Sequence, residues 1–183
     1  MSKVHIFPAA VFTWDDIYTQ KEIKVFDRWI ADNVSWVYHS RSGEEKSENR
    51  FFTNHDPDDS FEKLPEIRQI LLDFTLATGI RVKSYERVYL NGQTYGLDGT
   101  WHTDYKRENY YTLLYMANSG NVSNAGNFEY IDPANPGYVE TVEYTSGRFV
   151  LFPSMWQHRG LATTLKNQIR MTLAFKACEV ELL

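Results

Sequence analysis

Two segments in the first half of the chain repeat apolar residues at the three- and four-residue spacing of an amphipathic helix. In the first segment, Thr13 is a suitable N-cap, and Asp15 and Asp16 are well placed against the positive end of a helix dipole. The pattern therefore predicts a helix that begins at Thr13. Its apolar face holds Ile23, Phe26, Trp29 and Ile30.

The second segment predicts a helix that begins near Pro65, a residue tolerated in a first turn, and ends at Gly79. Its apolar stripe comprises Ile67, Ile70, Leu71, Phe74 and Ala77. Between the two helices, a strand is expected at Ser35–Ser40, followed by the long and largely polar loop Arg41–Asp58. Loops of this length often cover binding sites, so the segment is interpreted either as a substrate lid or as a solvated insertion.

From about Ile80 onward, short β-rich runs alternate with turn residues such as Asn91-Gly92 and Ser146-Gly147. This spacing predicts a mainly β fold, either a barrel or a jelly roll, with the two helices packed against its outside. One domain is expected over residues 1–183, with a helical and lid part at about 1–80 and a β core at about 81–178. The expected strands are Val82–Leu90, Thr100–Tyr105, Tyr110–Ala117, Asn127–Ile131, Tyr138–Tyr144, Arg148–Phe152, Trp156–Arg159 and Ile169–Ala177.

Composition narrows the class of protein without identifying its function. Aromatic residues make up 15% of the 183 positions and charged residues 23%, which fits a folded domain. No apolar run is long enough to span a bilayer, and the net charge of −5 argues against a nucleic-acid surface, which needs grouped Lys and Arg. The single cysteine, Cys178, excludes an intrachain disulfide, and the first residues lack a secretory signal, so a cytoplasmic protein is expected.

Two of the five histidines, His102 and His158, have sequence surroundings that suit a metal site. His102 and Asp104 are two residues apart in an expected strand, so both side chains can point into one cavity. His158 follows several strands later and can return opposite this pair. Two imidazoles and one carboxylate form the facial triad of non-haem iron(II) sites, and they also suit catalytic zinc. Taken singly, the His102–Asp104 pair and His158 are each more typical of solvated or hydrogen-bonded side chains, so the metal site rests on their combination.

The last expected strand alternates between apolar and polar positions. Ile169, Met171, Leu173 and Phe175 fall on one face, and Arg170, Thr172 and Ala174 on the other. An arginine directed into a barrel needs an anionic partner, because an isolated buried charge costs several kcal/mol. A dicarboxylate co-substrate would supply one, held by Arg170 with help from Thr172. Two alternatives stay open, namely an internal acid such as Glu129 or Glu143, or Lys166 as the anchor in place of Arg170.

In combination, these motifs resemble the 2-oxoglutarate and iron(II)-dependent dioxygenases, on their prolyl 4-hydroxylase-like branch. The resemblance covers about half of the chain, roughly Ser84 to Ala177, and departs from the family pattern at Asn127, where a second glycine is usual. The segments that carry it are Tyr89–Tyr95, Trp101-His102-Thr103-Asp104, Leu113–Asn118, Gly126–Glu129, Gly147–Ser154, His158 and Arg170-x-Thr172.

The resemblance implies a double-stranded β-helix, or jelly roll, with the N-terminal helices packed on one sheet. It implies that His102, Asp104 and His158 bind Fe(II), and that Arg170 with Thr172 binds the C5 carboxylate of 2-oxoglutarate. Tyr115 matches a tyrosine that reaches the same carboxylate, and Tyr89 matches one that lines the pocket near the metal. O₂ would be the second co-substrate, with ascorbate as an accessory reductant. The resemblance therefore assigns roles to seven residues, namely His102, Asp104, His158, Arg170, Thr172, Tyr115 and Tyr89.

The implied reaction is hydroxylation of a prolyl or similar residue in a protein or peptide, with release of succinate and CO₂. A free amino acid or another small metabolite is the alternative substrate, and nucleic-acid demethylation ranks lower because the chain is acidic. Two other classes remain, a zinc hydrolase and a non-catalytic β-barrel binding module. Candidates for the substrate entrance are Phe51, Phe52, Trp101 and Trp156. Neither the oligomeric state nor the carbon oxidised follows from the sequence.

Overall fold

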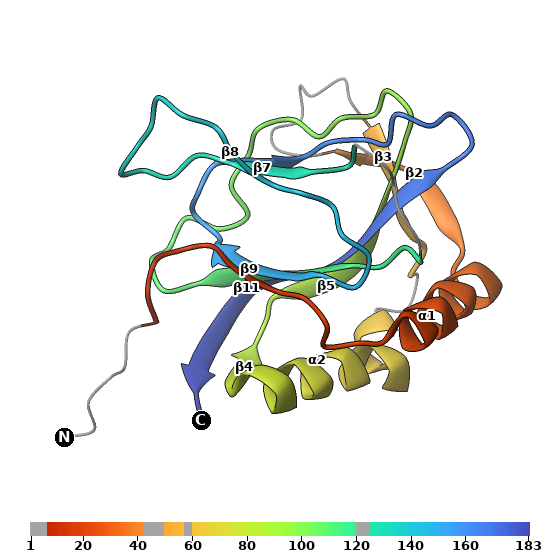
Figure 1. Cartoon of the computed structure of the whole chain (residues 1–183), viewed down its shortest axis with the longest axis horizontal. Helices are drawn as coiled ribbons and strands as arrows, with labels where there is room; N and C mark the ends of the chain where they lie inside the picture. The colour runs from red at the N-terminus through yellow and green to blue at the C-terminus, as the bar shows by residue number, and fades with distance from the viewer. Residues whose placement is uncertain (1–6, 42–49, 57–59, 120–124) are drawn as a thin grey trace.

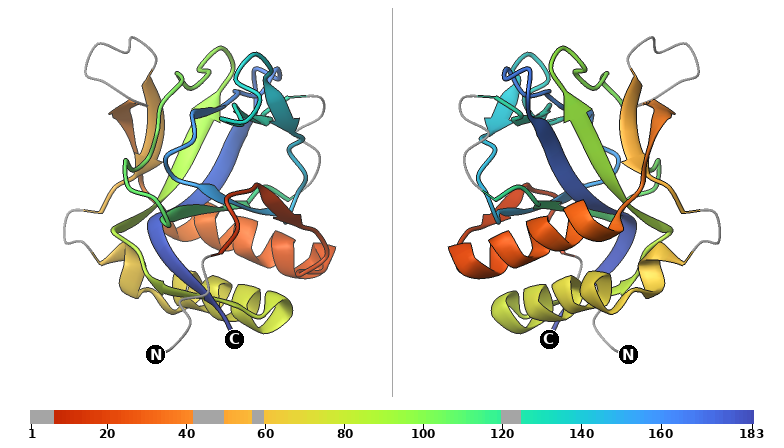
Figure 2. Two further views of the ribbon diagram at one scale, coloured as in Figure 1. Left: turned by 90° about the vertical axis from the view of Figure 1, so that its left-hand side faces the viewer. Right: turned by 90° about the vertical axis from the view of Figure 1, so that its right-hand side faces the viewer.

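The computed structural model describes residues 7–41, 50–56, 60–119 and 125–183. Over these residues the chain is mainly β, with two helices lying along one face of the larger of two antiparallel sheets (Figure 1). Figure 2 shows that both helices cover the same face, while β2 and β3 stand on one side of β5 and β11 and the smaller sheet stands on the other. The mainly β composition and the helices on one sheet agree with the sequence prediction.

The larger sheet is built around a long central strand, β11 (Ile169–Leu182), which pairs with β5, β6 and β4. The order of its main path, among the described residues, is β1-β9-β6-β11-β5-β3-β2. The smaller sheet has the order β10-β7-β8. The remaining bounds are β1 (Phe12–Trp14), β2 (Trp36–Arg41), β3 (Arg50–Asn54), β4 (Ile80–Ser84), β5 (Arg87–Thr94), β6 (Tyr111–Met116), β7 (Phe128–Tyr130), β8 (Glu140–Val142), β9 (Phe149–Pro153) and β10 (His158–Gly160).

Helix α1 (Gln20–Asn33) begins later than the pattern predicts. Thr19 is its N-cap, and Thr19 with Glu22 forms a capping box in which each side chain bonds the backbone amide of the other. Thr13 instead lies in β1, opposite Val150 of β9. The prediction of a helix from Thr13 is therefore wrong, and the Thr-x-x-Glu spacing was the better start signal.

Helix α2 (Pro65–Thr78) confirms the second prediction at both ends. Pro65 occupies the first turn, and Gly79 closes the helix in the left-handed conformation with φ of 71°. The buried face holds Ile67, Ile70 and Phe74, whereas Ala77 is exposed. A short 3-10 turn, Phe61–Lys63, precedes the helix.

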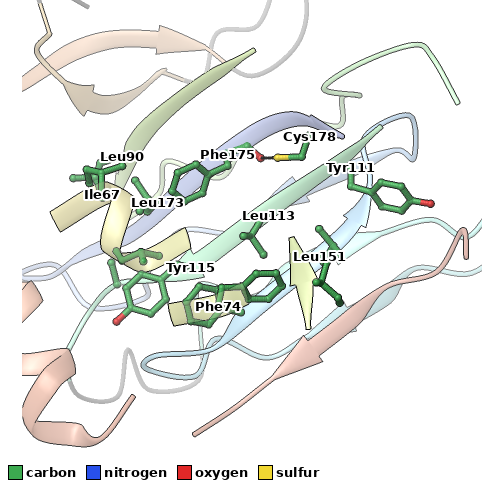
Figure 3. Close-up of a cluster of buried hydrophobic side chains, with 14 of the residues drawn as sticks. Ile67, Phe74, Leu90, Tyr111, Leu113, Tyr115, Leu151, Leu173, Phe175 and Cys178 are labelled. Atoms are coloured by element: carbon green, nitrogen blue, oxygen red, sulfur yellow. Dashed lines mark hydrogen bonds between the residues drawn. The ribbon is translucent and has the colours of Figure 1, made fainter. Parts of the chain in front are cut away.

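Two apolar clusters lie on opposite faces of the larger sheet. The cluster between sheet and helices contains Phe74 of α2 and Leu113 and Tyr115 of β6 (Figure 3). The cluster between the two sheets contains Leu114 and Phe128 with their neighbours. Strands β6 and β11 supply alternate residues to the two faces, so the alternation predicted for residues 169–175 is confirmed.

The strand boundaries differ from the predictions where a turn signal was misleading. Val82–Leu90 is two strands, and β5 runs straight through Asn91-Gly92. A side chain would not fit at position 92, because a Cβ added to Gly92 would lie 2.9 Å from the Trp36 ring and 2.6 Å from Ile169. Thr100–Tyr105 is not a strand, since only His102 forms an isolated bridge there.

The predicted loop Arg41–Asp58 is wrong where the structure describes it. Residues 50–54 form β3, which pairs with β2 and β5 in the larger sheet. Residues 42–49 and 57–58 lie outside the described part of the chain. None of the helices that are described has the length and apolar character needed to cross a membrane.

Two glycines with positive φ allow a matched test of packing between α1 and the sheet. In Gly147, φ is 81° and an added Cβ would collide with Cδ1 of the buried Ile23, whereas Gly96 has φ of 78° and open space around it. Both alanine variants should lose about 1 kcal/mol from backbone strain. Gly147→Ala should lose roughly 1–3 kcal/mol more from overpacking. Chemical denaturation measures the difference, and equal losses in the two variants would contradict the tight contact.

Candidate active site

A cavity of about 1350 Å³ lies between β3, β5 and β11 on one side and the smaller sheet on the other. Its wall is completed by the irregular segment Thr100–Lys106. His102, Asp104, His158, Arg170 and Thr172 all line it, so the structure brings these five predicted residues together.

A backbone bridge places the two histidines side by side. The His102 amide donates to the His158 carbonyl at 3.1 Å, and the His158 amide donates to the His102 carbonyl at 2.9 Å. The ring centroids lie 4.3 Å apart. Asp104 is fixed by the same kind of contact, since its amide donates to the Ser154 carbonyl at 2.9 Å. The ligand atoms of the three residues all lie within 4.8 Å of one another.

The Nδ1 atom of each imidazole contacts a backbone carbonyl, which fixes the orientation of the ring. Nδ1 of His102 lies 2.9 Å from the Thr100 carbonyl, and Nδ1 of His158 lies 2.9 Å from the Trp156 carbonyl. A carbonyl can only accept, so the neutral form of either ring carries its proton on Nδ1 and leaves the lone pair of Nε2 free to bind a metal. Burial lowers the pKa of His102, against the opposing effect of Asp104, which favours the neutral ring that a metal needs.

The Asp104 carboxylate has polar partners on both oxygens. Thr112 donates its hydroxyl to Oδ2 at 2.7 Å, and the Lys176 ammonium donates to Oδ1 at 2.5 Å. The two histidine Nε2 atoms lie 3.4 Å from these oxygens, one from each. Burial by itself would raise the pKa of Asp104, but Lys176 and His158 hold it well below its usual range. The carboxylate is therefore charged, as a metal ligand must be.

These three residues fit a divalent metal ion. Two imidazole nitrogens and one carboxylate oxygen lie within 4.8 Å of one another, and their supporting hydrogen bonds fix ring orientation as in known metal sites. The donor set alone suits either non-haem iron or zinc.

Arg170 lies deep in the same cavity, with only 2% of its surface exposed. Its guanidinium donates to the Gly126 carbonyl at 2.8 Å, to Oε1 of Gln93 at 2.8 Å and to the Thr172 hydroxyl at 3.3 Å. It also packs 5.3 Å from the centre of the Tyr144 ring. All these partners are neutral. Burial lowers the pKa of Arg170 to about 10, so it remains charged at neutral pH.

The alternative of an internal acid does not hold. Glu129 pairs with Arg159 at 2.6 Å, and in the described parts of the chain no carboxylate lies within ion-pair distance of Arg170. Lys166, the rival anchor, is exposed on a turn and packs against Tyr95 outside the cavity. Gly160 leaves room for the guanidinium, since a Cβ there would lie 3.0 Å from Nη1 of Arg170.

The structure corrects the expectation for Tyr115. Its neighbours on β6 that face the cavity side are Thr112 and Leu114, so alternation sends Tyr115 to the helix side. There it is fully buried against Tyr18 and Phe149, and its hydroxyl is without a hydrogen-bond partner in the described residues. Tyr89, in contrast, lines the cavity.

Of the aromatic residues expected at the entrance, Phe51 and Trp101 line the cavity. Phe52 packs on Tyr38, and Trp156 stacks on Tyr130, so neither is among the lining residues that the structure describes.

Three side chains at the cavity escaped the sequence analysis. Gln93 orients Arg170, Lys176 contacts Asp104, and Arg87 lines the cavity beside them. The alternation that identified Arg170 and Thr172 continues to Lys176 and could have revealed it. Gln93 and Arg87 carry no such signal, because their positions depend on the pairing of β5 with β11.

The chain shares its fold with solved 2-oxoglutarate and Fe(II) oxygenases, and it carries a candidate two-histidine, one-carboxylate metal centre. A Pseudomonas putida prolyl-4-hydroxylase superposes with a TM-score of 0.59 at 15% identity, covering 91% of each chain. A 2OG-Fe(II) oxygenase family oxidoreductase from Burkholderia pseudomallei gives 0.64 at 11%, covering 91% of this chain and 84% of that one.

A Trichoplax adhaerens prolyl hydroxylase, in complex with a hypoxia-inducible factor peptide fragment, gives a TM-score of 0.63 at 13% identity, covering 93% of this chain and 84% of that one. These similarities show a shared fold. No protein-family model and no curated protein sequence matches the chain.

Removal of one candidate ligand tests the metal site. His158→Ala should weaken binding of Fe(II), or of Mn(II) as an air-stable probe, by about 100-fold or more, because it removes one of three protein ligands. His55→Ala is the matched control, since His55 lines the same cavity but lies outside the metal-ligand group. Anaerobic titration calorimetry measures both, and an unchanged affinity in His158→Ala would remove it from the ligand set.

Proposed function

We propose that the protein is an Fe(II)- and 2-oxoglutarate-dependent dioxygenase that hydroxylates a C–H bond, built on a double-stranded β-helix. The observation that carries the proposal is Arg170, a buried cation without an acidic partner among the described residues, in the cavity that holds the metal triad. Such a cation needs an anion, and a dicarboxylate bound to the metal at one end supplies it at the other. The shared fold supports the same reaction class.

Each residue then has a physical role. His102, Asp104 and His158 hold the metal on one side and leave its other positions to ligands. Arg170, oriented by Gln93 and Thr172, holds the C5 carboxylate of 2-oxoglutarate. When bound, Fe(II) with 2-oxoglutarate and O₂ supplies oxidative decarboxylation to succinate and CO₂, and the oxidising power for the hydroxylation.

Two substrate classes are candidates for this reaction. A prolyl or similar residue in a protein or peptide is supported by the sequence resemblance and by the peptide-bound prolyl hydroxylase of the same fold. A free amino acid or small metabolite is the alternative.

A zinc hydrolase and a non-catalytic binding module are the competing classes. Both accept the triad, but both leave Arg170 without a partner. Neither class predicts a metal-dependent response to 2-oxoglutarate, so the experiments below separate the dioxygenase from both of them.

Anaerobic protein loaded with Fe(II) should develop a visible charge-transfer band on addition of 2-oxoglutarate, because the keto acid chelates the metal. Admission of O₂ should then release succinate. His102→Ala and Asp104→Ala should abolish both signals. Absence of the band in protein shown by metal analysis to contain iron would contradict the proposal.

Arg170→Ala should weaken 2-oxoglutarate binding by about 10- to 100-fold, because a charged hydrogen-bonded pair contributes roughly 1.5–3 kcal/mol. Fe(II) affinity should change little, and this unchanged value also shows that the variant folds. Lys166→Ala is the control and should bind 2-oxoglutarate as the unmodified protein does. If only Lys166→Ala loses affinity, the anchor has been misassigned.

A further inference from the structure

Besides Arg170, two neighbouring cations line the cavity, and the proposed function gives them no role. Lys176 of β11 and Arg87 of β5 are direct partners in the antiparallel register, so their side chains leave the same face of the sheet. Both line the cavity. Nζ of Lys176 lies 5.1 Å, and Cζ of Arg87 5.5 Å, from the centre of the Tyr89 ring. Two like charges directly opposite each other destabilise a sheet unless something neutralises them.

The available acids neutralise this pair incompletely. Within the described residues, the ion-pair partner of Lys176 is Asp104, and Arg87 has none. Asp104 is also the carboxylate of the metal site, so a bound dication takes up its charge. The remaining lining acid, Asp56, accepts from the amides of Ser60 and Phe61. With metal in place, Asp104 offsets the charge of the buried Lys176 only in part, while Arg87 is exposed and has no acidic partner among the described residues.

The co-substrate does not fill this place. Lys176 lies six residues beyond Arg170 on β11, which separates their Cα atoms by about 20 Å along a strand. Under the proposed function, Arg170 and the metal already engage both carboxylates of 2-oxoglutarate. Lys176 touches a metal ligand, whereas Arg170 lies at the far end of the strand face. A carboxylate that binds Lys176 and Arg87 would therefore belong to another molecule bound beside the metal.

We propose that Lys176 and Arg87 bind the carboxylate of the primary substrate, which is a small carboxylic acid such as a free amino acid. Asp104 still offsets part of the positive charge of Lys176. The net charge left on Lys176 and Arg87 therefore matches the single negative charge of a carboxylate. The ammonium has three donors, of which the described partners Asp104 and Tyr89 use two. A prolyl residue inside a peptide has no carboxylate next to its ring, so this inference favours the small-molecule alternative. It rests on the proposed function.

The test compares each acid of a panel of free L-amino acids with its primary amide, and with a peptide that carries the residue internally. Anaerobic binding to protein saturated with Fe(II) and 2-oxoglutarate is measured by calorimetry and by the shift of the charge-transfer band. Succinate release is measured separately. At least one acid should bind and stimulate succinate release, and its amide should bind at least 10-fold more weakly.

Lys176→Met and Arg87→Met should each weaken binding of that acid about 10- to 100-fold, because each removes a charged hydrogen-bond donor while keeping the length of the side chain. Arg87 does not touch a metal ligand, so Arg87→Met should keep the affinities for Fe(II) and 2-oxoglutarate. Lys83→Met is the matched control, since Lys83 lies on β4 near Glu181, outside the cavity lining.

Three outcomes overturn the inference. These are equal binding of acid and amide, no stimulation by any acid in the panel, or a loss in the two variants that falls on 2-oxoglutarate instead of on the acid. In each case an intact charge-transfer band leaves the proposed function standing. Loss of the band in the unmodified protein would instead remove the proposed function.

Discussion

Strand β11 can occupy only one register in this fold, because its two faces carry side chains of opposite chemistry. Met171, Leu173 and Phe175 pack against the helices, while Arg170 and Lys176 face the cavity. A shift by one residue would place both cations in the apolar core and the apolar residues in the cavity. Since β11 pairs with three other strands, the same register also fixes Gln93 beside Arg170 and Arg87 beside Lys176.

The cavity reverses the electrostatic character of the whole chain. The protein carries a net charge of −5, yet the cavity lining includes four Lys or Arg residues and only two Asp. Both acids are already committed, one to the metal site and one to backbone amides. Of the four cations, Arg170 and Lys176 are buried, and a buried cation is unfavourable without an anionic partner. Lys176 pairs with Asp104, so Arg170 is the buried cation that most needs a bound anion.

The metal centre depends on backbone pairing more than on the His-x-Asp spacing. His102 and Asp104 do not lie on a regular strand, yet each amide hydrogen-bonds to the segment around Ser154 and His158. The Thr112 hydroxyl and the carbonyls of Thr100 and Trp156 then orient the three ligands. The sequence analysis expected His102 and Asp104 to share a face of a regular strand. In the structure an isolated backbone bridge between His102 and His158 brings the residues together instead.

Local sequence determined what local geometry can encode. The stripe and ends of α2 and the alternation of β11 follow from spacing, and the structure agrees with them. The His-x-Asp spacing also indicated two candidate metal ligands, which the structure brings together with His158. Only the tertiary structure decided the strand through Gly92, the position of Tyr115 away from the cavity, and the meeting of Arg87 with Lys176. Each of these depends on which strand lies beside which, and contacts between distant residues have no period along the chain from which they can be predicted.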